Sequence, residues 1–135
     1  METRQNFIDK IATGMAGSRL TLAPNRSNVS VNQIKNAFVH HVFFWLREPA
    51  DAEARQQFEL GLQSLIKVPQ IQSSHIGIAV ESSREVVDDS FTYSYMAFFR
   101  NKEDQDIYQT HPIHLKFVED CQHLWEKVVV YDAMV

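Results

Sequence analysis

The chain has 135 residues, of which 44% are apolar, 22% charged and 11% aromatic, with 13 Lys and Arg against 17 Asp and Glu. This composition excludes a disordered or low-complexity protein, because aromatic residues are spread along the chain and only 4 Gly and 4 Pro are present. The net charge of -4 argues against nucleic acid as the main partner, since phosphate binding needs a basic surface.

The cysteine count and the hydropathy of the chain exclude two further classes of protein. Cys121 has no partner for an internal disulfide, which excludes a secreted disulfide scaffold, and we expect it to be a half-buried helix residue. No stretch approaches the roughly 20 apolar residues that cross a membrane, so no membrane partner is expected.

Residues 1–35 are predicted to be an N-terminal extension, basic in contrast to the acidic remainder of the chain. They combine a weak helical pattern with a stretch rich in Ser, Asn and Pro. Arg4 and Phe7 also resemble part of a twin-arginine export signal, although Gln5 replaces the second arginine and Arg19 interrupts the apolar run. Two alternatives follow: a retained helix and linker in a cytoplasmic protein, or a degenerate signal in a periplasmic or otherwise exported one.

The next part of the chain is predicted to form a strand, a helix and a second strand. Residues 38–46 are β-branched and aromatic, which is typical of a strand. Asp51 is placed to cap a helix whose apolar residues recur near the 3.6-residue period until Pro69. Residues 71–80 contain an alternating apolar pattern that predicts another strand, and the polar residues 81–90 predict a long turn.

The last part adds a strand, a broken helix and a final strand. Residues 91–99 again have strand composition, and Asn101 can cap a short helix that runs to Tyr108. The pair His111–Pro112 begins another helix, since proline suits the first helical turn, and residues 128–131 form the last strand. The apolar face of this second helix is expected at Leu115, Val118, Leu124 and Trp125.

This order of elements predicts an α+β fold over residues 36–135: a ferredoxin-like unit with an antiparallel four-stranded sheet and helices on one face. Both faces of the first strand are apolar. Because the helices can cover only one face of the sheet, a second copy of the sheet is the simplest cover for the other, which predicts a homodimer with a barrel between two sheets. The two faces carry Phe38, Val42, Phe44 and Leu46 on one side and Val39, Phe43 and Trp45 on the other.

Three segments resemble the stress-responsive dimeric α/β barrel (Dabb) domain family: residues 39–43, residues 108–114 with their His-Pro-x-His element, and residues 125–132. The resemblance covers about residues 36–133. It implies a ferredoxin-like fold and a homodimer made by sheet-to-sheet packing. The family includes stress-induced plant proteins without an agreed reaction, and olivetolic acid cyclase-like proteins that close a polyketide by aldol condensation with no metal and no organic cofactor.

The same resemblance implies a site between the helices and the sheet. It gives catalytic roles to Tyr108 and His114 and a substrate-binding role to His41. A neutral imidazole suits the removal of a proton next to a carbonyl, and a tyrosine hydroxyl in a dry pocket suits the stabilisation of the resulting oxyanion. The residues expected to bind an apolar small molecule, unless they only fill the core, are His41, Phe43, Trp45, Tyr93, Tyr95 and Trp125.

The other histidines have simpler interpretations. His111 and Pro112 are expected to be structural, with His111 capping the following helix. His111 and His114 share a helix face, but no suitably spaced Cys or Glu completes a metal site, so no metal is expected. His40 and His41 point to opposite faces of their strand. The family resemblance implies that His41 faces the pocket, and His40 is then expected to face the dimer side.

Two functional hypotheses follow from these residues. The first is a cofactor-free cyclase or isomerase-like enzyme that acts on an oxo or polyketide-like small molecule, with His114 as general base and Tyr108 as hydrogen-bond donor. The second is a non-catalytic stress-response or small-ligand-binding dimer in which these residues are structural. Fold-level analogy does not choose between them.

Overall fold

The structure is a computed structural model that describes residues 32–135, so the predictions for the helix and export signal of the N-terminal extension lie outside the described residues. The chain divides into two compact units. One consists of residues 34–81 and 89–135 and contains the sheet and helices described below. The other includes the turn Ser82–Asp88.

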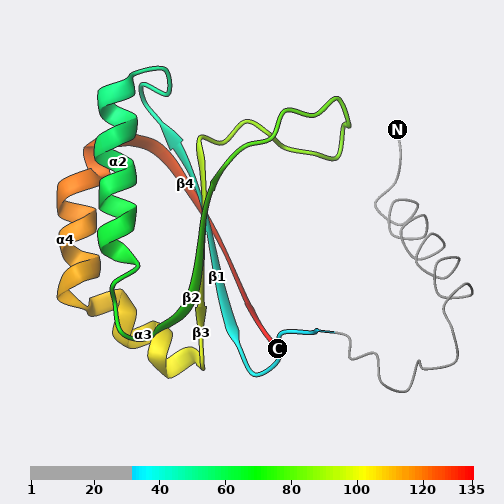
Figure 1. Cartoon of the computed structure of the whole chain (residues 1–135), viewed down its shortest axis with the longest axis vertical. Coiled ribbons are helices and arrows are strands. Elements are labelled where there is room, and N and C mark those ends of the chain that lie inside the picture. Colours follow the sequence, from blue (N-terminus) through cyan, green and yellow to red (C-terminus); the bar gives the residue numbers. More distant parts are fainter. Residues whose placement is uncertain (1–31) are drawn as a thin grey trace, which may run out of the picture. The chain divides into compact units, whose positions relative to one another are not determined.

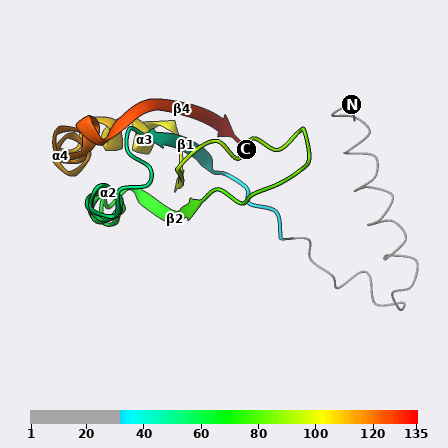
Figure 2. The same cartoon turned by 90° about the horizontal axis from the view of Figure 1, so that it is seen from above.

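The larger unit is an antiparallel four-stranded sheet with helices on one face, as both views show (Figures 1 and 2). The strand order is β2-β3-β1-β4, and every neighbouring pair is antiparallel. The predicted ferredoxin-like α+β fold is therefore confirmed. The elements are β1 (Phe38–Leu46), α2 (Ala52–Leu65), β2 (Ile71–Ile78), β3 (Tyr93–Phe99), α3 (Lys102–Thr110), α4 (Pro112–Cys121), a 3₁₀ turn at Gln122–Leu124, and β4 (Trp125–Met134).

Helices α2 and α3 begin where the sequence predicts. The side chains of Asp51 and Asn101 accept backbone N–H groups of the first turns of α2 and α3, at 3.0 and 2.8 Å respectively. Such caps satisfy donors that have no partner within the helix. Helix α2 ends four residues before Pro69, which cannot continue a helix.

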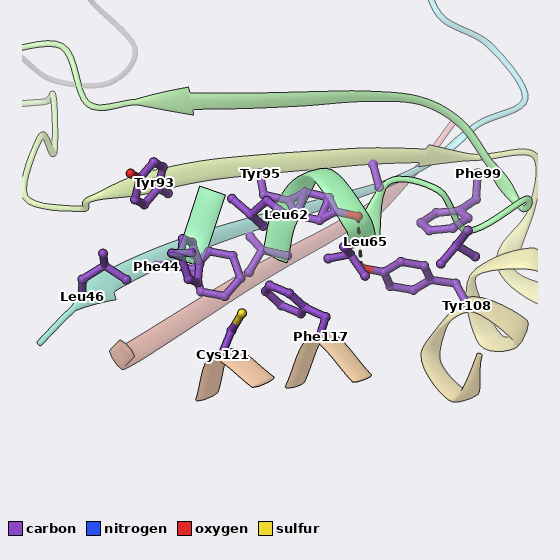
Figure 3. Packing of buried hydrophobic residues seen from close by; sticks show 14 of the residues in the cluster. Phe44, Leu46, Leu62, Leu65, Tyr93, Tyr95, Phe99, Tyr108, Phe117 and Cys121 are labelled. Atoms are coloured by element: carbon purple, nitrogen blue, oxygen red, sulfur yellow. Dashed lines mark hydrogen bonds between the residues drawn. The ribbon is translucent and has the colours of Figure 1, made fainter. Parts of the chain in front are cut away.

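The core lies between the sheet and helices α2 and α4 (Figure 3). Phe58 of α2 is 0% exposed and sits at its centre. Its ring centroid lies 4.9 Å from that of Phe44, 5.1 Å from Tyr93, 6.0 Å from Phe117 and 6.2 Å from Trp125. This cluster of aromatic rings joins two helices to three strands.

Four predictions for the end of the chain are wrong. Trp125 begins β4 instead of ending a helix, and this strand is longer than the predicted residues 128–131. Leu115 is 55% exposed, whereas Phe117 and Cys121 are buried, because these two lie one helical turn apart on the face of α4 that meets α2 and the sheet. Cys121 is also fully buried instead of half-buried.

Helices α2 and α4 approach each other closely at Gly61, which gives a testable result for stability. A Cβ atom at this position would lie 2.5 Å from Sγ of Cys121 and 3.3 Å from the Phe117 ring. We expect Gly61→Ala to lower the free energy of unfolding by about 1–3 kcal/mol in urea titrations, because overpacking outweighs the better helix propensity of alanine. The double variant with Cys121→Ala should recover part of this loss. A more stable Gly61→Ala protein would contradict the close contact.

Candidate functional site

Tyr108 of α3 and His114 of α4 pack against each other on the helix-covered face of the sheet. Their ring centroids are 4.7 Å apart. The Tyr108 side chain is 1% exposed, and its hydroxyl lies 3.0 Å from the hydroxyl of Tyr95 on β3 (Figure 3), while His114 is half-buried. The structure thus brings together the two residues for which the sequence predicts catalytic roles.

The break between α3 and α4 explains how residues six positions apart come into contact. His111 adopts an extended backbone conformation, and its N–H donates to the carbonyl of Tyr108 at 3.1 Å. Its Nδ1 atom accepts the N–H of Ile113 at 3.1 Å, and Pro112 is the first residue of α4. The chain therefore starts a new helix at once, which places His114 beside Tyr108.

His40 of β1 and Asp132 of β4 adjoin this pair, and sequence reasoning missed both. His40 is 6% exposed, its Nδ1 lies 2.7 Å from Oδ1 of Asp132, and its ring centroid lies 5.6 Å from that of Tyr108. The predicted orientation of the two adjacent histidines is therefore wrong: His40 faces the helices, and His41 faces the opposite side. We call His40, Tyr95, Tyr108, His114 and Asp132 the His–Tyr cluster.

Burial sets the protonation of the cluster. It raises the pKa of Tyr95 to about 12, although the hydrogen bond between the Tyr95 and Tyr108 hydroxyls lowers it in part. Burial, followed by the charge and hydrogen bond of Tyr95, raises the pKa of Tyr108 well above its usual range. Burial lowers the pKa of His114, against a smaller opposing effect of a hydrogen bond with the Gln109 backbone, and the charge of His40 lowers it further. At neutral pH the cluster therefore holds two phenols and a neutral His114 imidazole.

Among the buried side-chain polar atoms of the cluster, one ring nitrogen has no hydrogen bond in the part of the chain that the structure describes. Nδ1 of His114 is buried and has no hydrogen-bond partner within residues 32–135. Buried polar atoms in native proteins are nearly always hydrogen-bonded, so an exception calls for an explanation such as a catalytic role or a bound molecule.

The remaining predicted binding residues of the helix-covered face are parts of the core. Tyr93 donates a hydrogen bond from its hydroxyl to Oε1 of Glu59 at 2.5 Å, and burial together with this bond raises its pKa to about 12. Tyr95 belongs to the cluster described above. Trp125 packs against Phe44 with ring centroids 5.3 Å apart.

His41, Phe43 and Trp45 lie on the other face of the sheet, which no helix of the described residues covers (Figure 1). Nε2 of His41 lies 2.8 Å from Oγ of Ser94, and the His41 ring centroid lies 4.2 Å from that of Phe43. The indole N–H of Trp45 donates to Oγ of Ser90 at 3.0 Å. The structure therefore does not bring these three residues together with Tyr108 and His114.

The surface of the described residues has two notable hollows, and neither includes a predicted site residue. One, of about 500 Å³, lies between α2 and α4, and the other, of about 620 Å³, lies beside the first half of α2. Neither hollow is lined by Tyr108 or His114. Within residues 32–135 there is also no group of three or more His, Cys, Asp or Glu side chains that could hold a metal ion.

Comparison with known proteins identifies the family. The family model of the Stress responsive A/B Barrel Domain (Dabb) matches residues 38–135. This chain belongs to that family. No curated protein sequence matches it. Within residues 32–135, no helix of this Dabb protein is long and apolar enough to span a membrane.

Solved structures with the same fold include a Dabb family protein from Mesorhizobium loti, with 18% identity, a TM-score of 0.61 and coverage of 73% of this chain and 96% of that one. A hydroxynitrile lyase from Passiflora edulis has 21% identity and a TM-score of 0.64, and the match covers 73% of this chain and 93% of that one. A dimeric ferredoxin-like protein of unknown function from Thermobifida fusca has 15% identity and a TM-score of 0.60, and the match covers 80% of this chain and 97% of that one. These likenesses show a shared fold.

The lowered pKa of His114 predicts how stability depends on pH. Because the folded protein resists protonation of this ring, the unfolded chain binds more protons below its ordinary pKa of 6.5. The contribution to stability is therefore complete above pH 6.5 and is lost as the pH falls from that value through the lower pKa of the folded protein. In urea unfolding at about pH 7.5 and about pH 5.5, the loss of stability should be smaller for His114→Gln than for the wild type. Equal losses in the two proteins would contradict the lowered pKa.

Proposed function

We propose that this Dabb protein is a cofactor-independent enzyme that moves a proton on an uncharged oxo compound, as a cyclase or isomerase does. One observation carries the proposal: a neutral imidazole, His114, touches a protonated phenol, Tyr108, in an apolar interior and has a buried nitrogen without a hydrogen bond. A base and a hydrogen-bond donor at close range are the two groups that enolate chemistry needs.

The proposed roles follow from the protonation states. The unprotonated ring nitrogen of His114 accepts a proton from the carbon next to a carbonyl group, and the electrons of the broken C–H bond move onto the carbonyl oxygen. Tyr108 donates its O–H to that oxygen and keeps its own proton, because its pKa is high. His40, held by Asp132, packs against the Tyr108 ring and positions it.

The surroundings favour an uncharged substrate. The only carboxylate of the His–Tyr cluster, Asp132, is already bonded to His40, and Phe99 packs against Tyr108 with ring centroids 4.9 Å apart. A charged group in this interior would lose its hydration without gaining a partner. Ketones and polyketide-like molecules meet this condition.

Because Tyr108 is buried, substrate binding requires α3 and α4 to move away from the sheet.

One observation favours the alternative, a non-catalytic stress-response or small-ligand-binding dimer. Neither of the two hollows reaches Tyr108 or His114. In that case the cluster serves to hold α3 and α4 on the sheet.

A screen of uncharged ketones, phenols and polyketide lactones by thermal shift separates the two functions. Ligand binding to the folded protein raises its melting temperature. The enzyme proposal expects hits whose stabilising effect is reduced in both His114→Ala and Tyr108→Phe. The exposed His123 provides the control variant His123→Ala, which should bind like the wild type. Ligands that raise the melting temperature of both cluster variants as much as that of the wild type would favour the non-catalytic function.

We further propose that the protein is a homodimer by sheet-to-sheet packing and acts in the cytoplasm. The uncovered sheet face supports the homodimer. A strand whose second face meets water should carry polar residues on that face, whereas β1 is largely apolar on both faces. Structural neighbours from Bacteroides fragilis, Thermobifida fusca and a Jannaschia species are described as dimeric. The apolar side chains of this face include Val39, Phe43, Trp45, Met96, Phe98 and Val129.

Phe43 lies in the middle of this face and gives a direct test of the dimer. Its ring centroid lies 5.0 Å from that of Phe91 and 6.1 Å from that of Tyr131. We expect Phe43→Ala to raise the dimer dissociation constant about tenfold or more in sedimentation experiments, since central aromatic residues dominate interfaces. Leu60→Ala, on the helix layer, should not change it. A wild-type protein that is monomeric at micromolar concentration would contradict the dimer.

A further inference from the structure

An open groove of about 500 Å³ lies between α2 and α4, which are neighbours in the helix layer (Figure 1). No residue of a strand and no member of the His–Tyr cluster lines it. Its volume is within the range of small-molecule sites, roughly 300–1,000 Å³. The lining residues that matter below are Leu60, Gly61, Lys67, Lys116, Phe117 and Asp120.

The floor of the groove is apolar and depends on a glycine. Gly61 lines the groove with backbone atoms alone, and only glycine fits here, because a Cβ atom at this position would lie 3.3 Å from the Phe117 ring and even closer to Cys121. Leu60 is 62% exposed and adds an apolar wall. An alkyl chain placed along these side chains would remove their apolar surface from water.

The charges around the groove are not balanced. Nζ of Lys116 lies 3.0 Å from Oδ2 of Asp120, so these two groups compensate each other. Lys67, just beyond the end of α2, is exposed, and its ammonium has no ion-pair partner in the part of the chain that the structure describes. The groove therefore has one uncompensated positive charge, which favours an anion over a cation.

We propose that this groove binds a medium-chain carboxylate. The carboxylate pairs with the ammonium of Lys67, and the alkyl chain lies over Gly61 and Phe117 beside Leu60. This site is separate from the His–Tyr cluster, so it does not depend on the proposed enzyme activity.

Isothermal titration of the full chain with octanoate, 1-octanol and octylamine tests the proposal. We expect octanoate to bind more tightly than the other two. Lys67→Gln should weaken octanoate binding about three- to fivefold, which is the upper range for an exposed ion pair, and leave octanol binding unchanged. Leu60→Ser should weaken the binding of both ligands. Lys102→Gln, which removes an exposed lysine of α3, is the matched control and should bind octanoate like the wild type.

Any of the following results would overturn the proposal: no octanoate binding at millimolar concentration, equal octanoate affinity in the wild type and Lys67→Gln, or tighter binding of octylamine, which would assign the groove to cations through Asp120. His114→Ala should bind octanoate like the wild type. A loss in that variant would show that the ligand occupies the His–Tyr cluster instead, and would also overturn the proposal.

Discussion

Replacement of Phe58 by alanine should lower the free energy of unfolding by about 3–5 kcal/mol, the usual cost of removing a large buried aromatic side chain. Phe58 is fully buried, and its ring contacts four other aromatic rings, three of them on β1, β3 and β4 and one on α4. The neighbours come from different elements, so the structure cannot easily close the cavity. Urea unfolding monitored by tryptophan fluorescence measures the loss.

The matched control is Leu60→Ala on the same helix. Leu60 is mostly exposed, so its truncation should change the free energy of unfolding by no more than about 0.5 kcal/mol. Equal effects of the two substitutions would mean that α2 does not pack on the sheet through Phe58.

The periodic pattern of the chain predicted most of the fold. The strand at residues 38–46, the cap at Asp51 and the cap at Asn101 are found where local chemistry places them. Element ends were less predictable. The third strand starts at Tyr93 instead of Phe91, and Trp125 starts β4, because pairing with the neighbouring strand decides these ends and local composition does not.

The orientation of β1 shows why the site was harder to predict. Both faces of this strand are apolar, so alternation alone does not reveal which face the helices cover. His40 has the same parity as Phe38 and Val42, and once the helices are known to lie on that face, its place beside Tyr108 follows. The link from His40 to Asp132, 92 residues away, comes only from the pairing of β1 with β4.

His114→Ala should abolish most of the proposed proton transfer. General base catalysis by a positioned side chain contributes about 10²- to 10⁴-fold, and this ring is the neutral base closest to the phenol of Tyr108. Tyr108→Phe should cause a loss of about a hundredfold by removing the hydrogen bond to the oxyanion. Circular dichroism of both variants, with His123→Ala as the control, separates loss of chemistry from loss of folding.

The most direct measurement is exchange of the protons next to the carbonyl of cyclohexanone and 2-heptanone for deuterium, followed by NMR in D₂O. The proposed function predicts exchange above the buffer rate with the wild-type protein and with His123→Ala, and a loss of about a hundredfold or more with His114→Ala. Exchange at the buffer rate with the wild type, or equal exchange with folded His114→Ala, would contradict it.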